Sequence, residues 1–217
     1  MPEGVFEAIL FDMDGTLLNS SAVTDRVWRG WAVQHNRNEE DVLGILHGRR
    51  AIDTLLELGL GSTDAAREAN ALNMQEENDM DGVVALPGAQ QFLAMLPASR
   101  WAIVTSSTTV LAKRRLNAAG LPIPSVLVTC EDVIEGKPSP QGYLSAALRL
   151  GVNIGRCLVF EDSPAGIAAG HAAGAKVCGV GLAPEADYWI ENYFGLSAEY
   201  LGLGIRTRRS PVRQAIY

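Results

Sequence analysis

The chain has 217 residues, of which 47% are apolar and 20% are charged, and its formal net charge is -7. A chain of this composition can bury a full hydrophobic core, which excludes a disordered protein, and it contains no apolar run of about 18 residues that would span a membrane. The acidic balance argues against nucleic acid as a partner, because no general basic surface is available to displace counterions from phosphates.

The start of the chain and its cysteines indicate a cytoplasmic protein. Residues 1–7 lack the basic and then apolar pattern of a signal peptide. Cys130, Cys157 and Cys178 are scattered and have no Cys-x-x-Cys spacing, so the sequence suggests neither a disulfide framework nor a zinc site. We expect these cysteines to be small core residues.

The first predicted element is a strand at residues 8–11, a continuous apolar run typical of a strand buried on both faces of a parallel sheet. Asp12 and Asp14 follow directly, and Gly15 allows the sharp turn after them. Such a strand delivers carboxylates to the carboxyl edge of a sheet, where open α/β folds bind ligands. Two carboxylates about 4 Å apart repel each other by roughly 4 kcal/mol at an effective dielectric near 20, which favours a cation between them. An isolated pair is also compatible with a helix cap and a solvated carboxylate.

The following segment, residues 19–83, contains helical patterns and no strand-like run. Polar caps, apolar spacing and glycine stops predict helices at about residues 20–32, 38–48, 52–59 and 62–81. We expect this segment to form an all-helical cap domain.

From Leu86 onward the pattern alternates between strands and helices. Buried-type strands are predicted at residues 101–104, 126–128, 157–160 and 177–180. The helices between them are predicted at residues 89–96, 109–120, 140–150 and 163–174. Units of this length imply right-handed crossovers and a doubly wound parallel sheet. The predicted fold class is therefore α/β, with a Rossmann-type core domain at 1–18 and 84–217 and the cap domain, residues 19–83, inserted above the carboxyl edge of the sheet. The chain beyond Val180 receives no assignment.

Polar groups suited to phosphate and metal follow three of the predicted strands. They are Asp12 with Asp14, Thr105 with Ser106, and Glu161 with Asp162. Carboxylates gathered on one sheet edge would destabilise the fold without a counter-ion, and Mg²⁺ suits a site of few carboxylates, waters and a substrate phosphate. Lys137, fixed in a loop before a proline, is a compact positive charge for phosphate and for an attacking carboxylate.

Taken in order, these motifs resemble those of the haloacid dehalogenase superfamily of phosphotransferases. The motifs are Asp-Met-Asp-Gly-Thr at 12–16, Thr-Ser at 105–106, Gly-Lys-Pro at 136–138 and Glu-Asp-Ser at 161–163. More narrowly, the chain is similar to the capped sugar-phosphatase and beta-phosphoglucomutase branch. His-Gly-Arg-Arg at 47–50 resembles the cap loop of sugar, polyol and glycerol phosphatases. The resemblance covers about residues 6–180.

The resemblance implies a role for each aspartate. Asp12 would attack the phosphorus and form an aspartyl-phosphate, and Asp14 would protonate the leaving alcohol and later activate water. Mg²⁺ would be bound by Asp12, by the backbone carbonyl of Asp14 and by Asp162. Glu161 would be a further ligand or a partner of the ligands.

The resemblance also implies the substrate contacts. Thr105, the Ser106 backbone and Lys137 would hold the phosphoryl oxygens. The cap would contribute three further contacts, from His47, Arg49 and Arg50.

The leading hypothesis is a Mg²⁺-dependent cytoplasmic phosphatase acting on a small phosphorylated sugar or polyol. A phosphomutase is the nearest alternative, but the mutases of this branch have a histidine near position 24, where this chain has Thr24. A dehalogenase would not require the acid/base Asp14, and a catalytically silent phospho-ligand-binding protein would be expected to have lost Asp12 or Lys137. The sequence leaves the individual substrate and the oligomeric state open, and a monomer is compatible with it.

Overall fold

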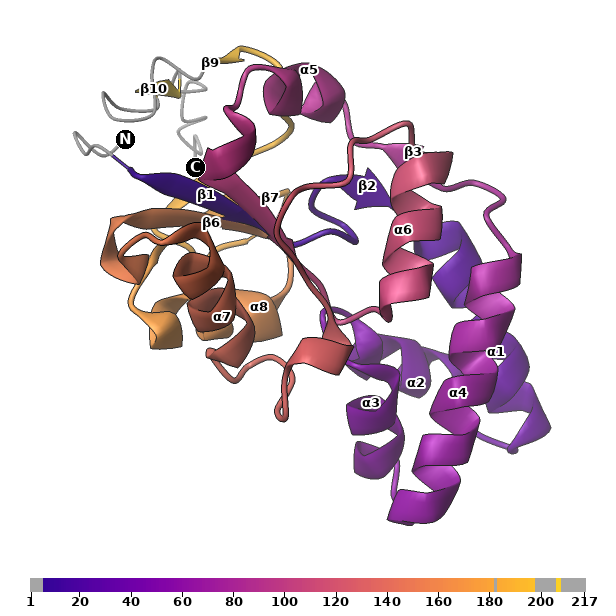
Figure 1. Ribbon diagram of the computed structural model, residues 1–217. Helices are drawn as coiled ribbons and strands as arrows, with labels where there is room; N and C mark the ends of the chain where they lie inside the picture. Colours follow the sequence, from indigo (N-terminus) through magenta and orange to yellow (C-terminus); the bar gives the residue numbers. More distant parts are fainter. Residues whose placement is uncertain (1–5, 182, 198–205, 208–217) are drawn as a thin grey trace, which may run out of the picture.

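A six-stranded sheet lies at the centre of the computed structural model, which describes residues 6–181, 183–197 and 206–207. Its strands are β1 (Ala8–Phe11), β4 (Trp101–Val104), β5 (Leu127–Val128), β6 (Cys157–Glu161), β7 (Lys176–Val180) and β8 (Tyr188–Ile190). All neighbouring strands are parallel, and their order is β5-β4-β1-β6-β7-β8 (Figure 1). The parallel sheet predicted from the sequence is confirmed.

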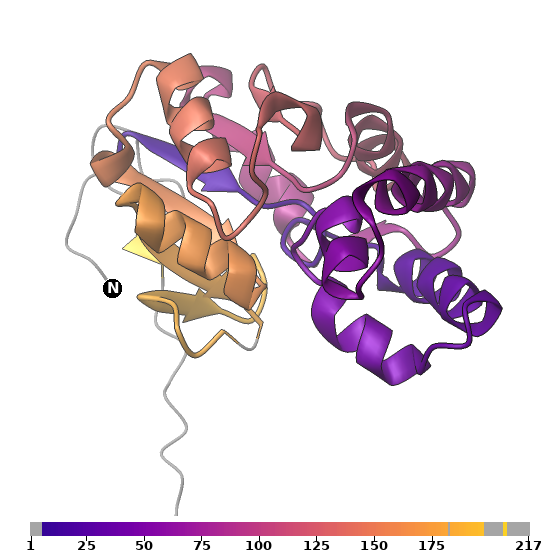
Figure 2. The same cartoon turned by 90° about the horizontal axis from the view of Figure 1, so that it is seen from below.

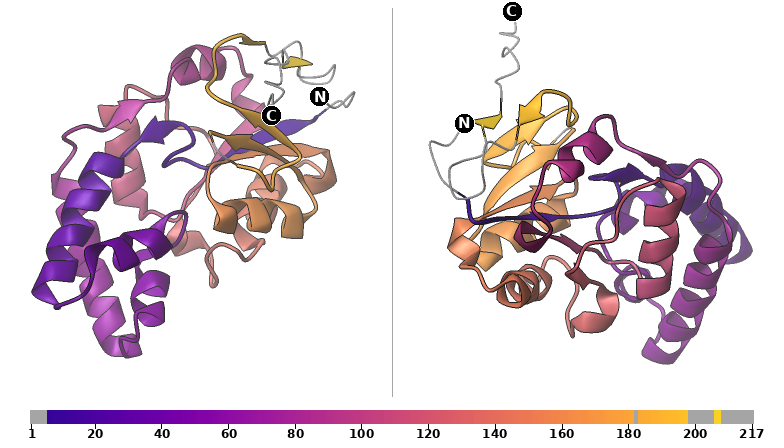
Figure 3. Two further views of the ribbon diagram at one scale, coloured as in Figure 1. Left: turned by 180° about the vertical axis from the view of Figure 1, so that it is seen from behind. Right: turned by 45° about the horizontal axis from the view of Figure 1, so that its top comes forward.

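Helices cover both faces of this sheet (Figure 3). They are α5 (Ala89–Ala94), α6 (Thr109–Ala118), α7 (Gln141–Leu150) and α8 (Pro164–Ala173). Side chains of the central strand alternate between two apolar clusters: Ile9 and Phe11 pack in the cluster that includes α5 and α6 residues, and Ala8 and Leu10 in the cluster that includes α7 and α8 residues. The doubly wound α/β fold is therefore confirmed as well.

Residues 20–83 form a helical insert beside the carboxyl edge of the sheet (Figure 1, Figure 2). Its helices are α1 (Ser21–Gln34), α2 (Glu39–Leu46), α3 (Ala51–Glu57) and α4 (Ser62–Asn78). The chain enters and leaves the insert through β2 (Leu18–Asn19) and β3 (Val84–Ala85), which pair antiparallel. This pair was not predicted, because two residues a strand are too few for a periodic signal.

Other elements complete the described part of the chain. Short 3-10 helices lie at Ala98–Arg100, Cys130–Asp132 and Ile154–Arg156, and β9 (Leu196–Ser197) pairs antiparallel with β10 (Arg206–Thr207). Cys157 and Cys178 are buried as expected, whereas Cys130 is only partly buried. None of the helices that the structure describes combines the length and the apolar character needed to cross a bilayer.

The strand β8 extends the sheet beyond the last predicted element. After it, Tyr193 is fully buried against Phe92 and Phe160, with ring centroids 5.6 Å and 5.7 Å apart. Gly88 adopts a φ of +82°, and a Cβ there would lie 2.8 Å from the backbone nitrogen of Phe194. The segment after β7 therefore packs closely on the start of α5.

Candidate active site

The turn after β1 brings the first motif against the end of β6. Asp12 N donates to the Phe160 carbonyl at 2.9 Å, and Thr16 Oγ1 donates to Asp162 Oδ1 at 3.0 Å. Gly15 has a φ of +83°, and a Cβ there would lie 2.0 Å from Asp162 Oδ2. Both the backbone angle and the lack of space therefore require glycine at this position.

Three carboxylates meet at these strand ends. Asp12, Glu161 and Asp162 each offer an oxygen, and these oxygens lie within 4.8 Å of one another. Lys137 Nζ donates to Asp12 Oδ1 and, at 2.6 Å, to Glu161 Oε1. Burial raises the pKa of Asp12 well above its usual value, although Lys137 opposes the shift. Burial, followed by the charge of Glu161, raises the pKa of Asp162 to about 7. The cluster holds more negative charge than one lysine balances.

Every hydrogen-bonding direction of Glu161 is used within the protein. Its Oε1 accepts from Lys137 and, at 2.8 Å, from the Tyr143 hydroxyl. Its Oε2 accepts from the backbone nitrogens of Asp162 and Ser163 at 3.1 Å and 3.2 Å, and from Ser163 Oγ at 3.1 Å. The side chain is fully buried, so its geometry suits a residue that orients Lys137 and the loop after β6. Tyr143 was missed by the sequence analysis; its only signal is a tyrosine in the apolar stripe of a helix, where a buried hydroxyl needs a partner.

Asp14 faces a different set of partners. Its carboxylate accepts from Ser20 Oγ at 2.7 Å, from Ser107 Oγ at 3.1 Å and from Arg115 Nη1 at 2.9 Å. Ser20 occupies the N-cap position of α1, but its hydroxyl makes no cap hydrogen bond and binds Asp14 instead. Ser20, Ser107 and Arg115 were not predicted from the sequence as site residues.

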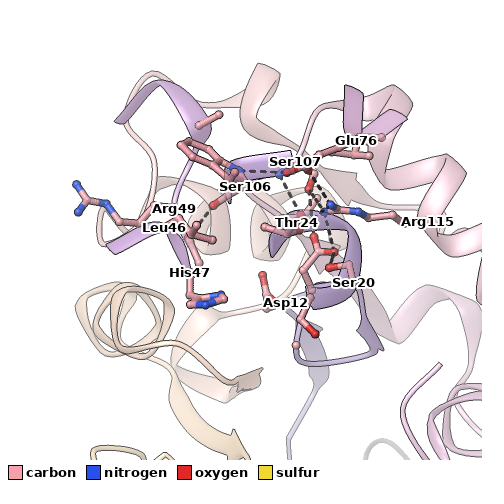
Figure 4. Close-up of a pocket in the computed structure, with 18 of the residues that line it drawn as sticks. Asp12, Ser20, Thr24, Leu46, His47, Arg49, Glu76, Ser106, Ser107 and Arg115 are labelled. Atoms are coloured by element: carbon pink, nitrogen blue, oxygen red, sulfur yellow. Dashed lines mark hydrogen bonds and ion pairs between the residues drawn. The ribbon is translucent and has the colours of Figure 1, made fainter. Parts of the chain in front are cut away.

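Arg115 joins Asp14 to the helical insert (Figure 4). Its Nη2 donates to Glu76 Oε2 at 2.7 Å and to Thr24 Oγ1 at 3.1 Å. Glu76 also accepts from the Trp28 indole at 3.1 Å. Burial raises the pKa of Glu76, while Arg115 opposes that shift. On a helix, an arginine and a glutamate look like solvated residues in the sequence, which is why this buried network gave no signal.

The second motif lies between Asp12 and the insert. Thr105 is buried, and its Oγ1 accepts from the backbone nitrogen of Ser107 at 3.1 Å. Ser106 Oγ donates to the Gly48 carbonyl at 2.9 Å. A Cβ on Gly48 would lie 2.1 Å from Ser163 Oγ, so the loop of the insert rests directly on the core.

A pocket of about 210 Å³ joins these groups. Its lining includes Asp12, Asp14, Thr105, Ser106 and Asp162 from the predicted site, together with Ser20, Thr24, Trp28, Asn73, Glu76, Ser107 and Arg115. Lys137 contacts Asp12 but is not part of this lining.

The predicted cap-loop residues separate into two positions. His47 and Arg49 line the pocket (Figure 4). Arg49 Nη1 contacts Oε2 of Glu57, which lies outside the lining. Arg50 does not line it. Its guanidinium pairs with Asp53 at 2.6 Å and 2.8 Å and donates to the Ile134 carbonyl at 3.0 Å.

Known proteins are similar to this chain over most of its length. Residues 6–174 match the family model described as haloacid dehalogenase-like hydrolase. The chain is 42% identical over 178 residues to hexitol phosphatase A of Escherichia coli (strain K12), covering 80% of this chain and 82% of that protein. It is 32% identical over 198 residues to glycerol-1-phosphate phosphohydrolase 2 of Saccharomyces cerevisiae, covering 85% and 78%. The solved structure of beta-phosphoglucomutase from Clostridium difficile has a similar fold, with a TM-score of 0.79 and 24% identity over 91% of this chain and 96% of that one.

Proposed function

Because the chain belongs to the haloacid dehalogenase-like hydrolases and is a phosphatase, we propose that it hydrolyses a small phosphorylated polyol or sugar with the help of Mg²⁺. The superfamily and the enzyme class predicted from the sequence are confirmed. The relatives named for hexitol and glycerol-1-phosphate support the substrate class. The cytoplasmic location and the division into a core and a cap at residues 19–83 belong to the same proposal.

One observation carries the mechanism: Asp12 and Asp14 open into the same pocket but have separate partners. Asp12 contacts Lys137, whose positive charge favours the carboxylate form that a nucleophile needs. Asp14 reaches into the pocket from the next turn, where the leaving oxygen of a substrate can accept its proton.

The residues at the strand ends fit Mg²⁺. Carboxylate oxygens of Asp12 and Asp162 lie close together, and oxygen ligands are those that this hard cation prefers. The excess negative charge of the site also favours a cation there. With Asp12 and Asp162 we propose the backbone carbonyl of Asp14 as a ligand. Glu161 is proposed as a positioning residue and not as a ligand, because both of its oxygens are engaged. When bound, Mg²⁺ would neutralise the carboxylates and draw charge from the phosphoryl oxygens.

The protein's own groups account for the proton and phosphoryl movements. Asp12 attacks the phosphorus, the bond to the alkoxide oxygen breaks, and Asp14 gives that oxygen its proton. Thr105, Ser106 and Lys137 are proposed to hold the phosphoryl oxygens during transfer. Asp14, now ionised, then takes a proton from the water that attacks the aspartyl-phosphate, which releases phosphate and restores Asp12.

The insert is proposed to close over the substrate and exclude bulk water. Its pocket residues include His47 and Arg49, which we propose as contacts to the hydroxyl groups of the substrate. Arg50 is proposed to act indirectly, since it holds the insert to the Ile134 carbonyl. Thr24 supports a phosphatase over a phosphomutase. The mutases have a histidine near this position, whereas the Thr24 hydroxyl accepts a hydrogen bond from Arg115.

Turnover of p-nitrophenyl phosphate, glycerol 1-phosphate and sorbitol 6-phosphate tests this function. We expect Mg²⁺-dependent release of phosphate from all three, and loss of turnover in EDTA that added Mg²⁺ restores. Turnover that is unchanged after exhaustive chelation would exclude a role for Mg²⁺ in the reaction. A preference for nucleotides or phosphopeptides would exclude small phosphorylated polyols and sugars as the substrate class.

A further inference from the structure

One wall of the pocket is formed by side chains from helices and not from strand ends. Thr24 and Trp28 come from α1, Asn73 and Glu76 from α4, and Arg115 from α6. In the proposed phosphatase the strand ends bind phosphate and metal. The remainder of the substrate would therefore lie between this helical wall and the loop that carries His47 and Arg49.

Two carboxylates already share the arginine of the helical wall. The Arg115 side chain is 4% exposed, and it pairs with Asp14 at 2.9 Å and with Glu76 at 2.7 Å. The other oxygen of Glu76 accepts from the Trp28 indole, so the carboxylate is held in one position. When Asp14 is ionised, one guanidinium faces two carboxylates; when Asp14 carries the proton that it donates, Glu76 alone balances Arg115, so Arg115 has no surplus charge for a substrate anion.

The remaining strong cation of the pocket is paired too. Arg49 Nη1 contacts Glu57 Oε2, and among the described residues no lysine lines the pocket. A second anionic group on a substrate would therefore enter a largely buried wall in which each arginine already pairs with a carboxylate. Burial of an unpaired charge is costly, and like charges brought together at a recognition site oppose binding.

We propose that Glu76 restricts this phosphatase to monophosphates whose remainder is uncharged. Carboxylate, amide and hydroxyl groups of the helical wall can exchange hydrogen bonds with a neutral polyol, whereas a substrate carboxylate or second phosphate faces Glu76. Glu76 is thus a specificity-determining residue. This inference rests on the proposed function and narrows its substrate class.

Sorbitol 6-phosphate and 6-phosphogluconate make a matched pair of substrates, because they differ only in an alcohol or a carboxylate at C1. We expect kcat/KM to favour the alcohol by about a hundredfold or more, since like charges brought together at a recognition site oppose binding.

Glu76→Gln tests the origin of this preference. The substitution keeps the shape of the side chain and an acceptor for the Trp28 indole, but it removes the negative charge. Arg115 can then attract a substrate anion. The preference in kcat/KM for sorbitol 6-phosphate over 6-phosphogluconate should therefore fall about tenfold. Glu68→Gln is the control, because Glu68 lies on the same helix and accepts from the Trp31 indole at 3.1 Å but does not line the pocket. The Glu68→Gln enzyme should prefer sorbitol 6-phosphate over 6-phosphogluconate as strongly as the wild type does.

Asn73→Lys is a second test that leaves the Glu76 pair intact. It adds a cation to the partly exposed edge of the helical wall and should also lower the preference for the alcohol. Equal rates on the two substrates in the wild type would overturn the proposal, as would an unchanged preference in folded Glu76→Gln and Asn73→Lys proteins. If neither these substrates nor p-nitrophenyl phosphate is hydrolysed, the proposed function fails and this inference fails with it.

Discussion

Asp12 and Asp14 are two residues apart in the sequence but belong to differently built halves of the site. The Asp12 half consists of strand ends and one loop lysine, and its charges are almost fully buried. The Asp14 half combines a core helix with the insert through Arg115 and Glu76. The first half is fixed by the register of neighbouring strands, whereas the second exists only while helices of the insert pack on the core.

The largest expected loss of activity comes from a substitution in the Asp12 half. Asp12→Asn keeps the size of the side chain and removes its nucleophilicity. We expect kcat/KM to fall by more than about a thousandfold, or about 4 kcal/mol of barrier, on every substrate. Steady-state assays with p-nitrophenyl phosphate and sorbitol 6-phosphate measure the loss, and circular dichroism checks the fold. A residual rate within about tenfold of the wild type would remove Asp12 from the nucleophile role.

The second prediction concerns the stability of the same half. Lys137→Met leaves the buried carboxylates of Asp12 and Glu161 without their cation, so unfolding free energy should fall by about 3–5 kcal/mol. Urea denaturation at pH 7 without metal measures it. Lys176→Met is the control, because Lys176 forms an exposed pair with Asp187 and its loss should leave the midpoint unchanged. Equal shifts of the urea midpoint in Lys137→Met and Lys176→Met would contradict the buried pairing of Lys137 with Asp12 and Glu161.

The third prediction separates the two halves. Asp14→Asn keeps the backbone carbonyl but cannot donate or accept the catalytic proton. Hydrolysis of sorbitol 6-phosphate should fall by about a hundredfold or more, and formation of phosphoenzyme from p-nitrophenyl phosphate should fall less, because p-nitrophenolate leaves without a proton. Rapid-quench experiments should detect accumulating phosphoenzyme. If none accumulates and steady-state turnover is normal, Asp14 is not the acid/base.

The smallest expected effect distinguishes the two arginines of the insert loop. Arg49→Ala should lower kcat/KM for sorbitol 6-phosphate by about tenfold relative to p-nitrophenyl phosphate, since one charged hydrogen bond is lost. Arg50→Ala should affect both substrates alike, because Arg50 contacts the Ile134 carbonyl outside the pocket lining. The ratio of the two substrates is the measurement. If Arg50→Ala lowered kcat/KM for sorbitol 6-phosphate more than for p-nitrophenyl phosphate, Arg50 and not Arg49 would be the substrate contact.

The sequence predicted that the residues of the Asp12 half would lie together, because strand ends leave a local signature. An apolar run followed by Asp12 or Glu161 identifies both the strand and its edge, and parallel pairing brings the two carboxylates together. The strand β4 was predicted with its observed bounds for the same reason.

The other half could not be predicted from local patterns. Whether Arg115 meets Glu76 depends on how α6 packs against α4, and both residues fit an exposed helix face equally well. The same limit applies to Arg50, whose position depends on the loop before Lys137. The short strands β2, β3 and β8 were also not predicted.

The two-residue ladder between β2 and β3 has a mechanical consequence. Both connections to the insert pass through it side by side, so we expect it to act as a hinge with one axis and the insert to swing as a rigid body. Contacts between the insert and the core, among them Ser106 with Gly48, Arg50 with Ile134 and Arg115 with Glu76, would then break in one step. Opening should be cooperative, and the intrinsic fluorescence of Trp28, whose indole donates to Glu76, should report a single exponential phase for the release of product.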